Sequence, residues 1–156
     1  MTIRALDRRG FLTRSFALGL TTALGTTLAS SLARAEWNKA AFDGKSIADA
    51  MKSLGVAGAA DSADVQILAS DIAENGAVVP VQAVSKIPGT TRISVLVEKN
   101  PNTLAALFEI GPDMVPDVTT RIKMGQTSNV IVLVEAGGKH FTATKEIKVT
   151  LGGCGG

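Results

Sequence analysis

A series of short β-prone runs between residues 65 and 150 most constrains how this chain can fold. The runs are rich in Val, Ile, Leu and Thr and are bounded by turn formers such as Asn-Gly, Pro-Gly and Gly-Pro; the pair Gly137-Gly138 is the strongest hairpin signal. Seven such runs predict an antiparallel β-sandwich, immunoglobulin-like in outline. No long helical pattern alternates with them, which argues against a parallel α/β sheet. The runs are 65–70, 78–85, 92–98, 104–110, 118–124, 128–135 and 139–150.

One short helix is predicted ahead of these runs. Ser46 and Asp49 have the spacing of a capping box, and Gly55 is suited to end the helix. Residues 55–63 are rich in small side chains and are predicted to be a connection. The fold class is therefore mainly β with a short N-terminal helix. The apolar face of the helix would be formed by Ile47, Met51 and Leu54.

Two of the β-runs are apolar on both faces. Residues 130–134 read Val-Ile-Val-Leu-Val, and 93–97 is nearly as apolar, whereas 139–149 alternates between apolar and polar residues. A two-sheet sandwich covers only one face of each strand. The other face of these two runs could be covered by the N-terminal helix or by another protein.

Residues 1–35 have the composition of an export signal. The pair Arg8-Arg9, in Asp-Arg-Arg-Gly-Phe-Leu-Thr, resembles a twin-arginine (Tat) motif, and the uncharged run 15–33 leads to a small-x-small cleavage site. That run is diluted by Gly, Ser and Thr, which argues against a retained membrane anchor. We therefore expect a periplasmic protein that is cleaved after Ala35 and has no stable membrane insertion.

The charge balance differs between the signal and the rest of the chain. The full sequence has a formal charge of +2, but the signal holds five arginines against one aspartate, so the remaining 121 residues carry −2. No basic cluster remains outside the signal, and aromatic residues are few. These features exclude a nucleic-acid-binding protein.

The chain ends in Gly-Gly-Cys-Gly-Gly, and Cys154 is its only cysteine. Glycine leaves the backbone torsions nearly free, so residues 152–156 predict a flexible arm that reaches about 17 Å when extended. A free thiol has a pKa near 8.5, and no residue in the arm would favour its ionisation. We therefore expect another protein to activate this thiol, which is the behaviour of a carrier. The flexible flanks of the thiol would be Gly152, Gly153, Gly155 and Gly156.

This ending resembles the C-terminal motif of the SoxY family. The similarity extends to the blocks 72–80 (Ile-Ala-Glu-Asn-Gly-Ala-Val-Val-Pro) and 97–102 (Val-Glu-Lys-Asn-Pro-Asn), and so covers essentially the whole chain after the signal. Thr103 stands where this family often has proline. The terminal motif is the specific part of the resemblance, and the domain it implies spans 36–151.

The resemblance implies a covalent carrier of sulfur intermediates in periplasmic thiosulfate oxidation. Cys154 would hold the substrate as an S-thiosulfonate and later as a persulfide, with no catalytic residue, metal or other cofactor of its own. The implied partners are SoxZ, in a heterodimer exported as a folded pair, and transiently the cytochrome SoxAX, the hydrolase SoxB and the sulfur dehydrogenase SoxCD.

Two other functions fit parts of the sequence. A structural immunoglobulin-like module could use Cys154 for an intermolecular disulfide, and a thiol enzyme would need a base beside the sulfur. His140, the only histidine, follows the Gly-Gly turn on the polar side of its run and is predicted to be an exposed surface residue. One histidine and one cysteine do not suggest a metal site. Asp61 and Asp64 are interpreted as turn residues, and so is the segment 74–76.

Overall fold

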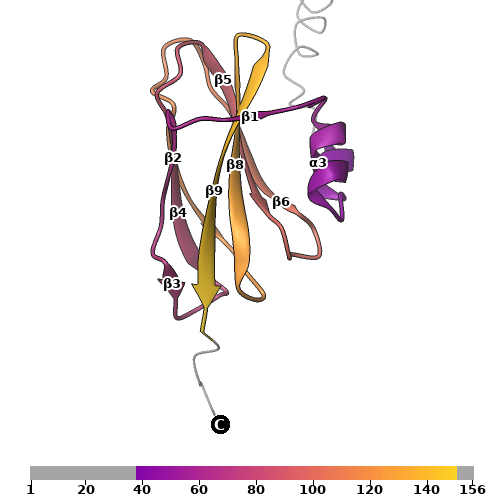
Figure 1. Cartoon of the computed structure of the whole chain (residues 1–156), viewed down its shortest axis with the longest axis vertical. Coiled ribbons are helices and arrows are strands. Elements are labelled where there is room, and N and C mark those ends of the chain that lie inside the picture. Colours follow the sequence, from indigo (N-terminus) through magenta and orange to yellow (C-terminus); the bar gives the residue numbers. More distant parts are fainter. Residues whose placement is uncertain (1–37, 151–156) are drawn as a thin grey trace, which may run out of the picture. The chain divides into compact units, whose positions relative to one another are not determined.

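The computed structural model describes residues 38–150. The predicted export signal and the Gly-rich arm with Cys154 lie outside these residues. Within these residues two short helices precede nine strands. Figure 1 shows their arrangement. The helices are α2 (Lys39–Phe42) and α3 (Ile47–Ser53). The strands are β1 (Ala60–Asp61), β2 (Val65–Leu68), β3 (Ile72–Ala73), β4 (Val79–Ser85), β5 (Thr90–Val97), β6 (Leu104–Glu109), β7 (Asp117–Ile122), β8 (Ser128–Ala136) and β9 (Lys139–Val149).

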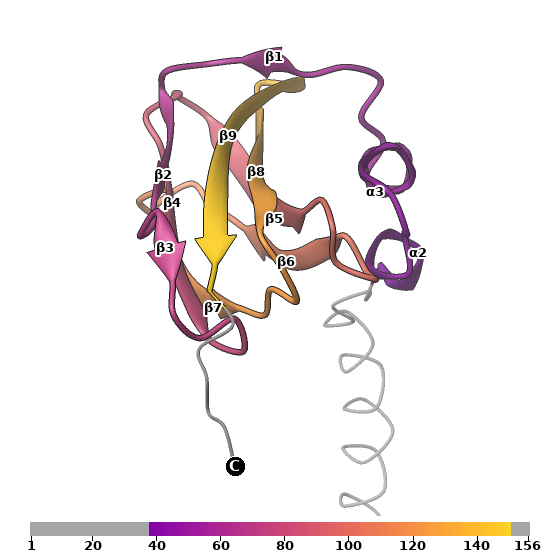
Figure 2. The same ribbon diagram turned by 60° about the horizontal axis from the view of Figure 1, so that its bottom comes forward.

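The described residues form three layers. The larger sheet has the order β1-β9-β8-β5-β6, with β3 also pairing with β9, and it faces a smaller sheet of order β2-β4-β7. The two helices lie on the other side of the larger sheet (Figure 2). The mainly β, immunoglobulin-like sandwich predicted from the turn pattern is confirmed.

All seven predicted runs form strands, β2 and β4 to β9. The β8–β9 hairpin turns at Gly137 and Gly138, whose φ angles of +56° and +73° suit the left-handed turn that joins twisted strands in two residues. The helix prediction is also confirmed: the Ser46 hydroxyl accepts the Asp49 N–H at 3.1 Å, and Gly55 follows with φ +78°.

Three short elements were not predicted, namely α2, β1 and β3. β1 lies within the stretch that was predicted to be only a connection. Both β1 and β3 pair with β9 in parallel, so the larger sheet is not wholly antiparallel, as the sequence had suggested. Strands of two residues carry no periodic signal, and their pairing is set by the tertiary structure.

Two apolar clusters explain the strands that are apolar on both faces. Between the sheets pack the inward residues of β4, β5 and β8, such as Val81, Val95 and Val132, each at most 1% exposed. On the outer face of the larger sheet, Leu96 and Leu133 pack under Ala50 and other residues of the helices. The helices thus cover the face that the sequence left open to either a helix or a partner.

Thr103 ties this helical layer to the larger sheet. Its N–H donates to the Gly44 carbonyl at 3.1 Å, in the connection between α2 and α3. A proline has no N–H to donate. Thr103 therefore supplies a hydrogen bond between layers that a proline at this position would lose.

Candidate functional site at the end of β9

The last described residues of the chain are held from both sides. The Val149 N–H donates to the Thr127 hydroxyl at 3.0 Å, and the Thr150 N–H donates to the Ala73 carbonyl at 3.1 Å. β3 lies along this end of β9, with Ile72 opposite Lys148 (Figure 1). Any arm beyond Thr150 therefore starts from a fixed point on the sandwich, which we call the root.

Gly76 lets a turn approach the root closely. A Cβ at this position would lie 2.3 Å from the Met124 carbonyl oxygen and 2.9 Å from a methyl group of Val149, so no side chain fits. The Gly76 carbonyl accepts the Met124 N–H at 2.7 Å, and the Asn75 side chain accepts the Ala77 N–H at 2.9 Å. The turn predicted at 74–76 runs from Asn75 to Val78, where the Val78 N–H donates to the Asn75 carbonyl at 3.2 Å. Block 72–80 thus builds the wall beside the end of β9.

A lysine on the inner side of β9 fixes the approach to β3. The Lys145 ammonium donates to the Ala69 carbonyl at 2.6 Å and pairs with the Asp71 carboxylate at 2.9 Å. The hydrogen bond and the charge of Lys145 lower the pKa of Asp71 below its ordinary value. The Asp71 carbonyl in turn accepts the Lys148 N–H at 2.9 Å. These bonds hold the segment that leads into β3 against β9.

Cys154 and the four glycines around it lie outside the described residues, but covalent geometry limits their reach. Cys154 is four residues beyond Thr150, so their Cα atoms can be at most about 14 Å apart. The sphere of this radius around the root contains every position open to the Cα of Cys154.

His140 lies at the opposite end of β9. Ten residues of extended chain separate it from Thr150, a span of about 33 Å. The reach of the arm leaves about 19 Å of this between the Cα atoms of His140 and Cys154, and their two side chains shorten the gap by about 10 Å. Even an arm fully extended back along the strand would leave about 9 Å between the imidazole and the sulfur, beyond hydrogen-bonding distance. The only histidine therefore cannot serve as a base for Cys154.

The prediction that His140 is an exposed surface residue is wrong. Its side chain is only 17% exposed and lines a small gap with Leu54 and Val56, which follow α3, and with Glu135, whose carboxylate lies 4.0 Å away. Arg92 bridges the same carboxylate at 2.9 Å. The alternation of residues along the strand correctly predicts that His140 faces the outer side of the sheet. It cannot predict that the residues at the end of α3 cover this side.

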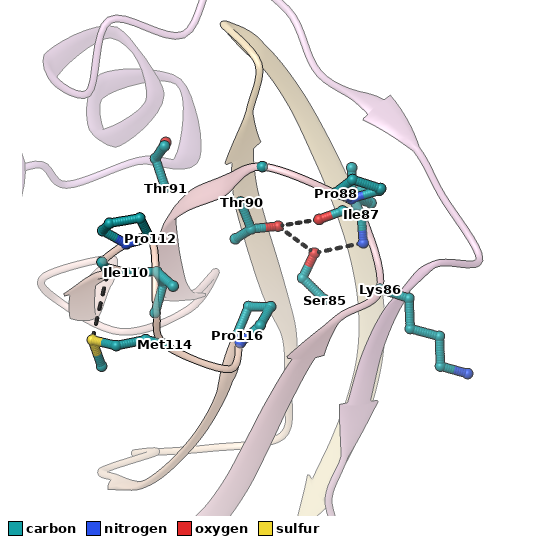
Figure 3. A pocket seen from close by; sticks show the side chains of 12 residues that line it. Ser85, Lys86, Ile87, Pro88, Thr90, Thr91, Ile110, Pro112, Met114 and Pro116 are labelled. Atoms are coloured by element: carbon teal, nitrogen blue, oxygen red, sulfur yellow. Dashed lines mark hydrogen bonds between the residues drawn. The ribbon is translucent and has the colours of Figure 1, made fainter.

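The described residues also contain hollows far from the root. One of about 490 Å³ lies between the β4–β5 turn and the β6–β7 loop (Figure 3). Its wall is mostly apolar, the hydroxyls of Ser85 and Thr90 bind each other at 2.8 Å, and the Lys86 ammonium points away from it (Figure 3). A second, of about 660 Å³, is lined by residues 55–60 and by the start of β9, including His140. Both hollows lie at the end of the sandwich where β9 begins, so neither is a site for the thiol.

Other groups considered in the sequence have structural contacts. The Asp64 N–H donates to the Ser62 hydroxyl at 3.2 Å, in keeping with the predicted turn role. The turn prediction is wrong for Asp61, which lies in β1 and accepts the Thr142 hydroxyl of the neighbouring strand β9 at 2.9 Å. Within residues 38–150 no cluster of three or more His, Cys, Asp or Glu could hold a metal ion. In the same part of the chain, no helix has the length and apolar character needed to cross a bilayer.

Comparisons with known proteins relate this arrangement to one family. The family model described as "Sulfur oxidation protein SoxY" matches residues 50–154 and so runs from α3 to Cys154. Among solved structures, the sulfur carrier protein SoxY from Chlorobium limicola f thiosulfatophilum is similar with a TM-score of 0.59 and 42% identity, over 65% of this chain and 92% of that chain. No curated protein matches this sequence significantly.

A more distant structure shares the architecture. The superoxide reductase (neelaredoxin) from Ignicoccus hospitalis is similar with a TM-score of 0.50 and 16% identity, over 56% of this chain and 83% of that chain. At this identity the likeness concerns the fold alone. The family match and the solved carrier, by contrast, agree with the terminal motif, and the chain belongs to the SoxY family of sulfur-oxidation proteins.

Proposed function

We propose that this protein is a periplasmic, non-catalytic carrier that holds sulfur intermediates covalently on Cys154 while partner enzymes oxidise and hydrolyse them. The family membership supports a carrier in sulfur oxidation. The observation that carries the proposal is the position of the root: the arm starts at the end of β9 remote from His140 and from both hollows. The only imidazole and both hollows therefore lie beyond the reach of the thiol, which supports activation by another protein.

The chemistry of a thiol suits this role. Joining Cys154 to thiosulfate forms a sulfur–sulfur bond to give an S-thiosulfonate, and releases one proton and two electrons. The electrons would pass to the c-type cytochrome SoxAX. Water would then cleave the terminal sulfone group as sulfate under SoxB and leave a persulfide on Cys154. The remaining sulfane sulfur would be oxidised by SoxCD, or passed on elsewhere.

A stable partner and export through the Tat route are part of the proposal. SoxZ would form the heterodimer, and the pair would be exported folded with the signal cleaved after Ala35. The sequence first offered the doubly apolar strands as support for a partner, but α2 and α3 cover the outer face of the larger sheet. The partner proposal therefore depends on the family and on the twin-arginine motif.

Intact-protein mass spectrometry after native purification tests the proposal. We expect adducts heavier by whole sulfur atoms or by a thiosulfonate group, all removed by a reductant and all absent from Cys154→Ser. This variant should also lose thiosulfate-dependent electron flow while its folding and partner binding are kept. Finding only a free thiol or a protein–protein disulfide would instead support a structural module, and turnover by the purified chain alone would support a thiol enzyme.

A further inference from the structure

The large apolar side chains that residues 38–150 leave exposed fall into two groups. Three lie on the segment 68–78, which runs from the end of β2 through β3 to the start of β4. The other two lie on the β6–β7 loop beside the hollow of Figure 3. The first group is Leu68, Ile72 and Val78, each about half exposed, and the second is Met114 and Val115.

Two members of the first group lie beside the root. Ile72 is the strand partner of Lys148, so its Cα lies at most about 12 Å from that of Thr150. Val78 follows two residues after Gly76, which packs against Val149. We call Ile72 and Val78 the root patch. They are 54% and 50% exposed, and the sandwich itself leaves them uncovered.

The length of the arm dictates what must approach this patch. An enzyme that acts on an adduct of Cys154 has to reach a side chain whose Cα lies within about 14 Å of the Thr150 Cα. A standard protein interface covers about 800 Å² on each partner, which corresponds to a disc of roughly 16 Å radius. Such a disc centred on the root includes the root patch. An enzyme seated on the arm therefore covers this patch.

The other apolar group cannot belong to the same contact. Pro116, which follows Val115, accepts the Ser85 N–H at the far end of β4, and β4 starts beside the root at Val79. The six residues between Val79 and Ser85 span about 20 Å. Met114 and Val115 thus provide a matched control: two exposed apolar side chains of similar size, on the same fold, outside the reach of the arm.

We propose that the root patch is the docking surface for the enzyme whose active site receives the Cys154 adduct. The occupant is a protein with an apolar rim around the mouth of a narrow active site. Once the root patch is bound to this rim, the arm enters the active site within one complex. Docking therefore raises the effective concentration of the adduct at the mouth of the active site. This inference rests on the proposed carrier function.

The test compares two double variants of the full-length mature protein in complex with its stable partner. Ile72→Ser with Val78→Ser removes the root patch, and Met114→Ser with Val115→Ser is the control. The thiol is first loaded with tetrathionate: the thiolate attacks a sulfane sulfur, forms the S-thiosulfonate and releases thiosulfate. Release of sulfate by the hydrolase is then followed at several carrier concentrations. Thermal unfolding of each variant verifies that the fold is kept.

We expect kcat/KM for sulfate release to fall about tenfold in the root-patch variant, with kcat at saturation unchanged, because serine at both positions removes apolar surface that docking would bury. The control should stay within about twofold of the wild type, and alkylation of free Cys154 by iodoacetamide should be equal in all three proteins. Equal kcat/KM in both variants would overturn the inference. So would loss of the stable partner or a change of oligomeric state in the root-patch variant alone, because either would show that the patch belongs to a permanent interface. No sulfate release from loaded wild type would refute the carrier function itself.

Discussion

The separation between His140 and the root allows a quantitative prediction about the thiol. We consider His140→Gln, which removes the only imidazole and keeps a side chain able to form hydrogen bonds. If His140 activated Cys154, a direct pair would lower the thiol pKa by one unit or more. The structure instead leaves at least about 9 Å between the two groups.

At that distance even a full charge has little effect. Two unit charges about 9 Å apart in water interact by about 0.5 kcal/mol, or about 0.3 pKa unit. Salt at physiological strength has a Debye length of about 8 Å and reduces this to about 0.1 unit. We therefore expect the pH at which alkylation reaches half its maximal rate to differ by less than about 0.2 unit between wild type and His140→Gln.

Alkylation with iodoacetamide between pH 6 and 10, followed by intact mass, measures this profile. A synthetic peptide with the sequence of residues 151–156 is the reference, and the folded protein should react within about twofold of it. A rate tenfold above the peptide, or a profile that shifts by a full unit in the variant, would refute the reasoning. Either result would mean that this chain activates its own thiol.

Three further predictions concern the scaffold. Leu133 is 3% exposed under the helices, so Leu133→Ala should lower the free energy of unfolding by about 2–5 kcal/mol. Leu68 is 49% exposed, so Leu68→Ala should change this free energy by less than about 0.5 kcal/mol. Equal denaturation midpoints for the two variants would contradict the covered outer face. Gly76→Ala should lower the free energy of unfolding, measured by urea titration, by about 1–3 kcal/mol, because the new Cβ would clash with Met124. Gly58 lies in open space, so Gly58→Ala should leave the free energy of unfolding nearly unchanged. If Gly76→Ala were neutral, the turn could move away from the root. The folded-state pKa of Asp71 lies below 3.8, so the stability from its ion pair is present above that pH and is lost as the pH falls through the lower folded value. Asp71→Asn should therefore lower stability more at pH 6 than at pH 2, and an equal loss at both pH values would exclude the ion pair as the cause.

The elements that were predicted correctly are those that a few neighbouring residues determine. Gly137-Gly138 gave the β8–β9 hairpin and Ser46 gave the start of α3, because turns and caps depend on a few neighbouring residues. β3 could not be predicted from two residues, since its pairing with β9 depends on Lys145 and on the turn at Gly76.

The candidate site likewise has a part that the sequence predicts and a part that only the fold reveals. The attachment site at Cys154 stays a prediction, made from the cysteine and the glycines around it, because this composition suggests a flexible carrier. The surface around it could not be predicted, because Ile72 and Val78 are ordinary apolar residues in sequence, and only the fold leaves them exposed beside Thr150. The partial burial of His140 was missed for a similar reason, since the residues after α3 cover it.

The way β9 is flanked has a mechanical consequence. Residues 139–147 are paired with β8 without a break, and β3 holds the other edge at Lys148 and Val149. Hydrogen bonds in an antiparallel ladder lie perpendicular to the strand, so a pull along the strand axis loads many of them in shear instead of opening them one at a time. An enzyme that pulls the C-terminal residues into its active site would therefore stretch the arm and leave the strand pairing of the sandwich intact.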